Sequence, residues 1–544
     1  MRLNAAAMLV AATLASGLSA SMQQVLADEP KRGGTMTLTY KDDIATLDPA
    51  IGYDWQNPSM MQALFDGLMD YKPGTFQLVP NLAESYTVSD GGKTYTFKLL
   101  HGVEFQNGRE VTSADFKYSF ERILNPKTQS PAQSYFSVID GADLVIAGKS
   151  DHASGLLTPD PYTLVIKLAQ PKASFLNVLA MQFGSVVPKE VVDKYGADFG
   201  HHPLGTGAYR LTEWTPGQRL VFDRNPDYFH KDLPYLDKVV IQVGQDPSVS
   251  LLRLQRGEVD LLGDGVPPAQ FETVINDPNW KSLVVDGKQL QTSYITLNVK
   301  VPPFDKLAVR QAVNMAINKK RIVQIINNRA TVADQPLPPN MPGYDSAYSG
   351  YPYDPQTAKA LLAQAGFPDG FATTLFAINT DPNPRIAQAI QQDLQAVGIK
   401  AEIKSLAASA VIQAGGEPNQ APMIWSGGMG WIADFPDPSG FYWTILGCGG
   451  AVEGGWNWSW YCNKDIDARA AKADAMVDPS QTDARIALWR SVFDGVMKDA
   501  PWVPVFNEDF YTMHSARLEG QDNYFVSPTH IPIYYQELHA KDGQ

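Results

Sequence analysis

The sequence predicts a multidomain α/β protein, and three observations lead to this fold class. The chain has 544 residues, which exceeds the roughly 250–300 residues at which a single hydrophobic core stops growing, so two or three domains are expected. From residue 305 to about residue 500, helical and strand-like patterns alternate, which favours α/β units around a largely parallel sheet. The first half of the chain is richer in strands and turns.

Composition excludes several classes of protein. An apolar fraction of 44% and an aromatic fraction of 10% are typical of a globular chain. The net charge is −14 and no run of Lys and Arg occurs, which argues against a nucleic-acid partner. The only long apolar run lies at the N-terminus, so a multispan membrane protein is excluded. Two cysteines are too few for a cysteine-rich zinc or iron–sulfur protein.

The N-terminus has the pattern of a secretory signal peptide. Arg2 provides a positive charge, residues 5–20 form an apolar run without charge, and Ala27 precedes the expected cleavage site. We therefore expect a signal peptide over residues 1–27 and a mature chain that begins near Asp28, outside the cytoplasm. A membrane anchor is the alternative, which the short, alanine-rich run disfavours. No cysteine lies near the cleavage site, so a lipid anchor on cysteine is not available.

Cys448 and Cys462 can form a disulfide in such an oxidising compartment. Closing a loop of this length stabilises a fold by about 3 kcal/mol in the chain-entropy model. A pair of free, buried thiols is the alternative, which the compartment disfavours.

The first half predicts strands, turns and two helices. Strand-like patterns mark four segments, of which the second is a hairpin: residues 35–40, 86–100, 164–168 and 239–243. Apolar residues recur at helical spacing over residues 59–69. Thr112 has an acidic residue, Asp115, three positions further on, which is typical of a capping box at the start of a helix.

The second half predicts a series of helices with capping residues. Apolar residues at helical spacing cover residues 305–317, 358–365, 386–397, 466–475 and 484–497. Asp305 is the expected N-cap of the first helix, and Gly366 and Gly398 are expected at C-cap positions, the latter followed by a strand. Two extended segments, residues 296–303 and 503–510, are expected to cross between domains.

Motifs of common catalytic sites are absent from the sequence. It contains neither a GxSxG nucleophile elbow nor a GxxxxGK phosphate loop. Residues 205–207 begin like a dinucleotide loop, but Arg210 stands where the third glycine would be. His201 and His202 are adjacent, so their side chains point apart, and a solvated loop is expected there. We therefore expect no catalytic residue, no cofactor and no metal site.

Asp434 lies in an aromatic, proline-rich segment, residues 431–438. Pro436 and Pro438 exclude a helix there and favour a stiff, extended loop. Aromatic residues are dense around it: Trp425, Trp431, Phe435, Phe441, Tyr442 and Trp443. Because a carboxylate among aromatic rings is costly without a cation, a ligand ammonium is one expected partner. The alternatives are an aromatic core in which Asp434 accepts backbone N–H bonds, or glycoside hydrolysis by Asp434 and a second carboxylate.

A series of short motifs resembles a known family. In chain order the motifs are Leu47–Pro49, Leu64–Leu68, Pro80–Tyr86, Asp90–Phe97, Gly102–Phe105, Thr112–Phe116, Gly205–Tyr209, Arg256–Asp260, Pro303–Asp305, Val309–Ala312, Ala360–Leu362, Ala365–Phe367 and Trp431–Pro438. Each motif is weak alone, but in this order the set resembles the peptide/nickel-type extracellular solute-binding proteins, family 5, of ABC transporters. The resemblance covers nearly all of the mature chain.

The resemblance implies a two-lobe periplasmic-binding-protein fold of type II, from the large cluster with an extra subdomain in lobe one. Two crossover strands would join the lobes, which close on a ligand. The implied parts are residues 28–75 (lobe one), 76–202 (extra subdomain), 203–297 (lobe one), 298–506 (lobe two) and 507–544 (lobe one). The resemblance also implies a monomeric periplasmic receptor, not an enzyme, that serves the permease subunits and cytoplasmic ATPases of an importer.

The resemblance also implies a ligand site. In peptide-binding members of the family, an Asp in the tryptophan-containing loop pairs with the ligand α-ammonium, and Asp434 is the matching residue. The resemblance places further contacts at the backbone of Gly430, Trp431 and Ile432, and in the loop after the Asp48-Pro49 motif, at Tyr53, Asp54 and Trp55. The aromatic surroundings of Asp434 and the loop between the cysteines add Phe435, Trp425 and Asn457 as expected ligand contacts. Members with a cysteine pair after this loop close it by a disulfide, which matches Cys448 and Cys462.

Three departures from the family pattern keep other ligands open. Ala132 stands where oligopeptide binders have a contacting Tyr, residues 374–379 lack the Arg with which dipeptide binders hold the ligand carboxylate, and residues 407–410 lack an aromatic residue. A short peptide is the first expectation, and an opine-like conjugate or an oligosaccharide is the alternative. Nickel is disfavoured because no His or Cys cluster is present. Alternatives from other classes are a secreted hydrolase that uses Asp434 and a chaperone-like protein that binds unfolded chains.

Overall fold

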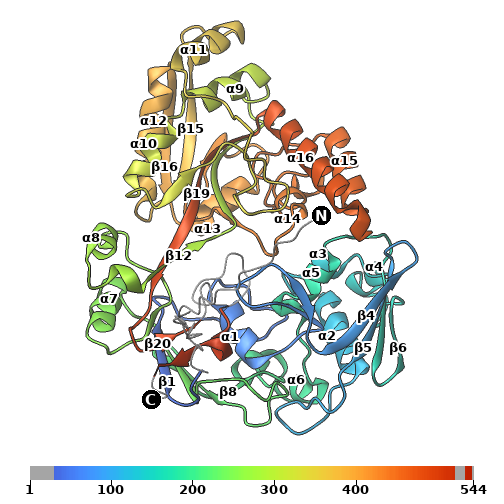
Figure 1. The fold of residues 1–544 in the computed structure, drawn as a ribbon. Coiled ribbons are helices and arrows are strands. Elements are labelled where there is room, and N and C mark those ends of the chain that lie inside the picture. Colours follow the sequence, from blue (N-terminus) through green and yellow to red (C-terminus); the bar gives the residue numbers. More distant parts are fainter. Residues whose placement is uncertain (1–29, 521–532, 542–544) are drawn as a thin grey trace, which may run out of the picture.

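The computed structural model describes residues 30–520 and 533–541, and the predicted signal peptide lies outside these ranges. Figure 1 shows two bodies, which we call lobe one (lower) and lobe two (upper). Lobe one holds the segments before β12 (Val284–Lys288) and after β19 (Trp502–Met513), and lobe two holds the segments between them. Among the described residues, no helix combines the length and the apolar character that crossing a membrane requires.

Lobe one is built on a five-stranded mixed sheet. Its strand order is β11 (Leu261–Leu262), β1 (Thr35–Thr39), β10 (Lys238–Gln242), β9 (Arg219–Arg224) and β8 (Tyr209–Thr215). β1 is parallel to β10 and β11, whereas β8, β9 and β10 are antiparallel. The strands predicted at residues 35–40 and 239–243 are therefore confirmed.

Lobe one also contains short helices and two small two-stranded sheets. They are α1 (Asn57–Leu64), α6 (Lys189–Tyr195), α7 (Pro247–Gln255), α8 (Phe271–Asn276), the 3₁₀ turns η2 (Gly196–His201), η3 (Lys281–Leu283) and η6 (Tyr535–Glu537), and the strand pairs β2 (Met69–Tyr71) with β3 (Leu78–Pro80) and β20 (Leu518–Glu519) with β21 (His539–Ala540). The helix predicted over residues 59–69 is confirmed as α1, but it ends at Leu64 because Phe65 adopts an extended backbone.

A second sheet, four-stranded and antiparallel, lies at the right of lobe one in Figure 1, and we call its region the extra subdomain. Its strand order is β4 (Ala83–Ser89), β5 (Thr94–Leu99), β7 (Thr163–Lys167) and β6 (Leu156–Asp160). Its helices are α2 (Ser113–Leu124), α3 (Gln133–Phe136), α4 (Ala142–Ile146) and α5 (Phe175–Leu179), followed by the turn η1 (Gln182–Gly184). The predicted hairpin and the predicted strand at residues 164–168 are confirmed.

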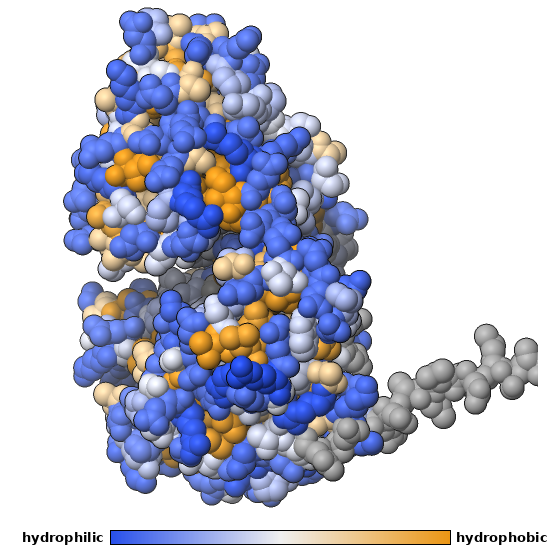
Figure 2. Space-filling view, turned by 90° about the vertical axis from the view of Figure 1, so that its left-hand side faces the viewer, coloured by the Kyte–Doolittle hydropathy of each residue, from blue (hydrophilic) through white to orange (hydrophobic). Residues whose placement is uncertain are grey.

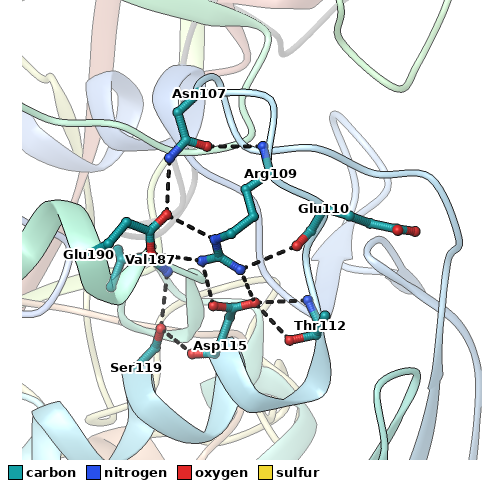
Figure 3. A network of polar contacts seen from close by, with 8 residues as sticks. All are labelled: Asn107, Arg109, Glu110, Thr112, Asp115, Ser119, Val187 and Glu190. Atoms are coloured by element: carbon teal, nitrogen blue, oxygen red, sulfur yellow. Dashed lines mark hydrogen bonds and ion pairs between the residues drawn. The ribbon is translucent and has the colours of Figure 1, made fainter.

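The start of α2 carries the predicted capping box, which Figure 3 shows. The backbone N–H and the hydroxyl of Thr112 each donate to Oδ2 of Asp115 at 2.9 Å. The guanidinium of Arg109 donates to both oxygens of Asp115 and also to Glu190 on α6. These bonds from Arg109 lower the pKa of Glu190 to about 2, and the network ties α6 to the first turn of α2.

Lobe two is built on an eight-stranded mixed sheet. Its main path is β12, β19, β13 (Gln291–Leu297), β17 (Met423–Trp425), β15 (Phe371–Ile378) and β16 (Ile399–Leu406), with β14 (Ala330–Val332) beside β19 and β18 (Trp431–Ile432) beside β13. Within the described part of this sheet, only β17, β15 and β16 pair in parallel, so the expectation of a largely parallel sheet is wrong. The other pairs are antiparallel because β13 and β19 run in opposite directions.

The helices of lobe two include all five that were predicted. They are α9 (Leu307–Ala316), α10 (Lys319–Ile325), α11 (Pro355–Gln364), α12 (Asn383–Ala396), α13 (Ala408–Gly415), α14 (Ser439–Tyr442), α15 (Lys464–Asp474) and α16 (Thr482–Asp499), with the turns η4 (Cys448–Gly450) and η5 (Pro479–Gln481). Gly366 and Gly398 follow α11 and α12, each at a φ of 93°. The expectation that Asp305 caps α9 is wrong, because Lys306 holds the N-cap position and the Asp305 carbonyl accepts a bond from Arg310.

Two extended segments join the lobes. β12 leads into β13, β19 returns, and β12 and β19 pair antiparallel between the two bodies. The crossing predicted at residues 503–510 lies within β19. The segment predicted at residues 296–303 begins at the end of β13, which is already paired on both edges inside lobe two. The first crossing therefore lies earlier in the chain, between β12 and β13.

The lobes also touch beside the extra subdomain. Phe435 of lobe two is 2% exposed and packs in the apolar core of the extra subdomain. The backbone N–H of Ala173 donates to the carbonyl of Asp474, on α15, at 2.8 Å. The structure is therefore a closed arrangement, in which the lobes meet at the crossing strands and again at the extra subdomain.

Candidate ligand-binding site

Asp434 is the point where three parts of the fold meet. It lies in the loop after β18 of lobe two and is 2% exposed. Tyr53 of lobe one donates its hydroxyl to Oδ1 of Asp434 at 2.5 Å. Tyr135, on α3 of the extra subdomain, donates its hydroxyl to Oδ2 at 2.5 Å. The carboxylate thus joins lobe two to both parts of lobe one.

The two tyrosines act as donors because they keep their protons. Burial, with the charge of Asp434, raises the pKa of Tyr53 and of Tyr135 well above the ordinary value. A carboxylate offers about four lone-pair positions, and the two hydroxyls take two of them. Asp434 therefore retains acceptor capacity for a further donor, such as an ammonium group.

The loop that carries Asp434 is fixed at both ends within lobe two. At its start, β18 pairs antiparallel with the first residues of β13. At its end, the buried carboxylate of Asp437 binds the guanidinium of Arg485, on α16, with N–O distances of 2.8 and 2.9 Å. Asp437 also accepts the backbone N–H of Ser439 at 3.0 Å. Both anchors of the loop therefore belong to lobe two, while the carboxylate itself is bonded to lobe one.

A cavity of about 510 Å³ lies between the lobes beside the crossing strands, and we call it the hinge cavity. Its walls are the loop after β11 in lobe one, both crossing strands, and the ends of α10 and α12 that face them in lobe two. Figure 2, which views the side that carries α7 and α8, shows a notch between the upper and lower bodies. This volume is within the range of small-molecule sites.

The hinge cavity and the Asp434 loop are neighbours. Gln291, the first residue of β13, lines the cavity and pairs with Ile432 of β18. A Cβ added at Gly430 would lie only 3.0 Å from Nε2 of Gln291. The backbone of Gly430, Trp431 and Ile432 therefore runs from the cavity wall to Asp434.

In the predicted loop after the Asp48-Pro49 motif, one residue contacts Asp434 and another lies beside the hinge cavity. Tyr53 reaches Asp434, as described above. Trp55 packs against Phe510 of β19, which lines the hinge cavity, with ring centroids 5.4 Å apart. Asp54 lies at the start of α1, where it accepts a bond from the Asn57 amide at 3.3 Å.

Trp425 and Asn457 lie inside lobe two. Trp425 is fully buried, and its indole N–H donates to Oδ1 of Asn383 at 2.9 Å. The buried amide of Asn457 donates to the carbonyls of Gly447 and Tyr461 at 3.0 and 2.8 Å. In this arrangement both side chains support the loops around them, and direct contact of either with a ligand stays a prediction.

The predicted disulfide between Cys448 and Cys462 is confirmed. The disulfide closes the loop in which the Asn457 amide donates to the carbonyls of Gly447 and Tyr461. A covalent bond and two hydrogen bonds therefore fix the same loop.

Replacing both cysteines by serine should lower the free energy of unfolding by about 3 kcal/mol, because the unfolded chain then loses its cross-link. Urea denaturation without reductant measures this loss. A reductant should destabilise the natural chain to the same extent and leave the double variant unchanged. Coincident denaturation curves for the natural chain and the variant would contradict the prediction.

Tyr135 is a site residue that the sequence did not predict. Ala132, the position compared with the tyrosine of oligopeptide binders, is fully buried in the core of the extra subdomain. The tyrosine that reaches Asp434 stands three residues later, on the short helix α3. A search for tyrosine within one helical turn of Ala132 would have found it.

The adjacent histidines lie away from this site. The expectation that the side chains of His201 and His202 point apart is wrong, because both contact the carboxylate of Asp198 in η2, at 2.9 and 3.2 Å. All three side chains are about half exposed, as expected of a solvated segment. Within the described ranges, no three His, Cys, Asp or Glu side chains are grouped as a metal ion would require.

The chain is similar to known proteins over most of its length. Residues 77–453 match the family model of the bacterial extracellular solute-binding proteins, family 5 middle. The glutathione-binding protein GsiB of Salmonella choleraesuis (strain SC-B67) is 30% identical over 483 residues, which cover 88% of this chain and 90% of that protein. The periplasmic binding protein DppA from Helicobacter pylori, solved with the peptide STSA, has 28% identity and a TM-score of 0.79 over 94% of this chain and 99% of that one. Clavulanic acid biosynthesis oligopeptide binding protein 2 has 26% identity and a TM-score of 0.84, over 94% and 96%.

Proposed function

Because this chain belongs to the bacterial extracellular solute-binding proteins of family 5, we propose that it captures short peptides between its two lobes and delivers them to an importer. It is a solute-binding protein of the ABC-importer class with the type II periplasmic-binding-protein fold. The peptide ligand is supported by its relatives, since GsiB is a glutathione-binding protein and the Helicobacter pylori DppA was solved with a peptide.

The contact of Asp434 with Tyr53 and Tyr135 is the observation that carries this proposal. It joins lobe two to both parts of lobe one, beside a cavity between the lobes. A ligand held there touches both lobes only when they are closed, so binding shifts the population toward the closed arrangement. That coupling is what a receptor needs if its partner distinguishes loaded from unloaded protein.

In this proposal the amino terminus of the peptide faces Asp434. The two tyrosine hydroxyls leave acceptor positions on the carboxylate for an ammonium group. Phe435 and Trp431 limit the access of water, which strengthens an ion pair at this point. The backbone of Gly430, Trp431 and Ile432 then lies along the ligand chain and offers hydrogen bonds to it.

The proposal includes a periplasmic location, a monomeric state, and permease subunits with cytoplasmic ATPases as partners. The relatives named above are binding proteins, which supports a receptor without bond chemistry. The opine, oligosaccharide and hydrolase alternatives gain no support from these relatives.

Ligand recovery and solution scattering test this proposal together. Mass spectrometry of the small molecules released by denaturing the purified protein should identify a short peptide or a peptide derivative. Adding that compound to protein stripped of ligand should reduce the radius of gyration, whereas maltotriose should leave it unchanged. Recovery of a sugar, or an unchanged radius of gyration at saturating peptide, would contradict the proposal that the ligand is a peptide.

A further inference from the structure

Some charged side chains that line the hinge cavity are paired with other groups of the protein, and others are not. Three of its carboxylates have partners: Asp509 with Lys288 at 2.6 Å, Asp381 with Arg385 at 2.8 Å, and Asp264 with the backbone N–H of Lys41 at 2.6 Å. Two further charged side chains, Glu508 and Arg329, line the same cavity.

Glu508 is a partly buried carboxylate without a close partner. It lies on β19 and, because side chains of a strand alternate, it shares its face with Phe510, which also lines the cavity. Among the described residues, the Glu508 side chain makes no hydrogen bond and no ion pair within 4 Å. Burial raises its pKa, and the more distant charge of Arg329 partly opposes this rise.

Arg329 is the complementary case, a cation without a carboxylate at contact distance. It follows α10 in lobe two, and its guanidinium lies over the ring of Phe271, in α8 of lobe one, 5.4 Å from the centroid. Its Nε is buried and, within the described part of the chain, has no hydrogen-bond partner. Arg329 and Glu508 thus face one cavity with opposite charges that do not meet each other.

A third polar group in the cavity wall also lacks a partner. Gln291 is 8% exposed, and its backbone carbonyl accepts a bond from Asn507. Its side-chain amide makes no hydrogen bond to any described residue. Of the three groups, Nε of Arg329 is fully buried without a partner among the described residues, and leaving such an atom without a hydrogen bond is unfavourable. A ligand carboxylate that accepts from Arg329 removes this cost.

We propose that the hinge cavity binds a zwitterionic end of the peptide ligand, that is, a terminal residue that bears both a carboxylate and a cationic group. The carboxylate faces Arg329, whose guanidinium suits a two-point contact with a carboxylate, and the cation faces Glu508. The side-chain amide of Gln291 donates a hydrogen bond to the ligand carboxylate or accepts one from the ligand cation. This assignment rests on the proposed function, since it describes one end of the same bound peptide.

The distance between Asp434 and the cavity wall suits a short ligand. Asp434 lies four positions after Gly430, which adjoins Gln291, and an extended chain of that length spans at most about 14 Å. A peptide of about three or four residues therefore reaches from Asp434 into the hinge cavity. Because the amino terminus of the peptide faces Asp434, the required end is a C-terminal residue with a basic side chain.

Binding of matched peptides to the full-length mature protein tests the assignment. The probes are Ala-Ala-Lys, Ala-Ala-norleucine, which lacks the cation, and Ala-Ala-Lys amide, which lacks the carboxylate. In calorimetry, the natural chain should prefer Ala-Ala-Lys by at least about tenfold over each incomplete probe.

Two variants test which side chain binds the cation of the terminal residue and which binds its carboxylate. Glu508→Gln should abolish the preference for the cation and leave the affinity for Ala-Ala-norleucine unchanged. Arg329→Gln should abolish the preference for the free carboxylate. Arg385→Gln is the matched control, because Arg385 lines the same cavity but is already paired with Asp381, and it should retain every preference. Glu508→Gln should also be at least as stable as the natural chain, since it removes an unpaired, partly buried charge.

The outcomes separate this assignment from the proposed function. A preference for Ala-Ala-Lys that Glu508→Gln removes supports a basic C-terminal residue in the hinge cavity. If the natural chain binds peptides without preferring Ala-Ala-Lys, or if both variants keep the preference, the subsite is wrong while the receptor function stands. If the natural chain binds none of these peptides and releases no peptide on denaturation, the proposed function fails and the subsite falls with it.

Discussion

Replacing Arg485 by methionine should lower the free energy of unfolding of lobe two by about 3–5 kcal/mol, the scale for breaking one buried ion pair. Arg485 is 9% exposed and binds both oxygens of Asp437, which is also buried. It further donates to the carbonyl of Ala473 at 3.1 Å. Methionine keeps an apolar stem but leaves the Asp437 carboxylate in the interior without its cation.

Urea denaturation followed by circular dichroism measures this loss. Arg385→Met is a matched control, because its pair with Asp381 is solvent-exposed and should contribute less than about 1 kcal/mol. Adding Asp437→Asn to Arg485→Met should restore part of the stability, since the uncompensated charge is then gone. Equal denaturation midpoints for Arg485→Met and Arg385→Met would show that the buried pair does not stabilise lobe two.

Elements that depend on neighbouring residues could be predicted from the sequence. The capping box at Thr112 and Asp115 needs only two residues three positions apart, and the structure has it. Gly366 and Gly398 take positive φ angles where the apolar stripes of α11 and α12 end. In each case the determining contacts lie within one turn of the chain.

Strand order could not be predicted in this way. Alternation of helix and strand holds for β15, α12 and β16, which form a parallel unit. The same sheet also contains β13 and β19, whose pairing joins residues about 200 positions apart and runs antiparallel. No local pattern distinguishes a strand that crosses between lobes from one that stays within its lobe.

The candidate site shows the same division. Composition alone pointed to Asp434, because the carboxylate stands among aromatic residues and prolines. Tyr135 and Arg485 were missed, since each contacts the Asp434 loop from a part of the chain that is distant in sequence. Glu508 and Arg329 were missed because a charge is ordinary in a sequence and becomes informative only when its surroundings offer no partner.

Replacing Asp434 by asparagine should weaken the binding of a peptide with a free amino terminus by about 2–5 kcal/mol, the scale for removing one partner of a buried charge pair. Asparagine nearly preserves the shape of the side chain, and the hydroxyls of Tyr53 and Tyr135 can still bond to its oxygen or accept from its amide. The change therefore removes the charge while most of the contact between lobes remains. Calorimetry with the recovered ligand measures the loss.

Tyr53→Phe separates the charge of Asp434 from the hydrogen bonds that surround it. This variant removes one hydroxyl at 2.5 Å from the carboxylate but keeps the negative charge, so the affinity should fall by about 1 kcal/mol, the scale of one hydrogen bond. N-acetylation of the peptide should weaken binding to the natural chain and have little effect on Asp434→Asn, because both changes remove the same ion pair. If Asp434→Asn binds the free peptide as tightly as the natural chain does, Asp434 only joins the lobes, and the amino terminus of the ligand lies elsewhere.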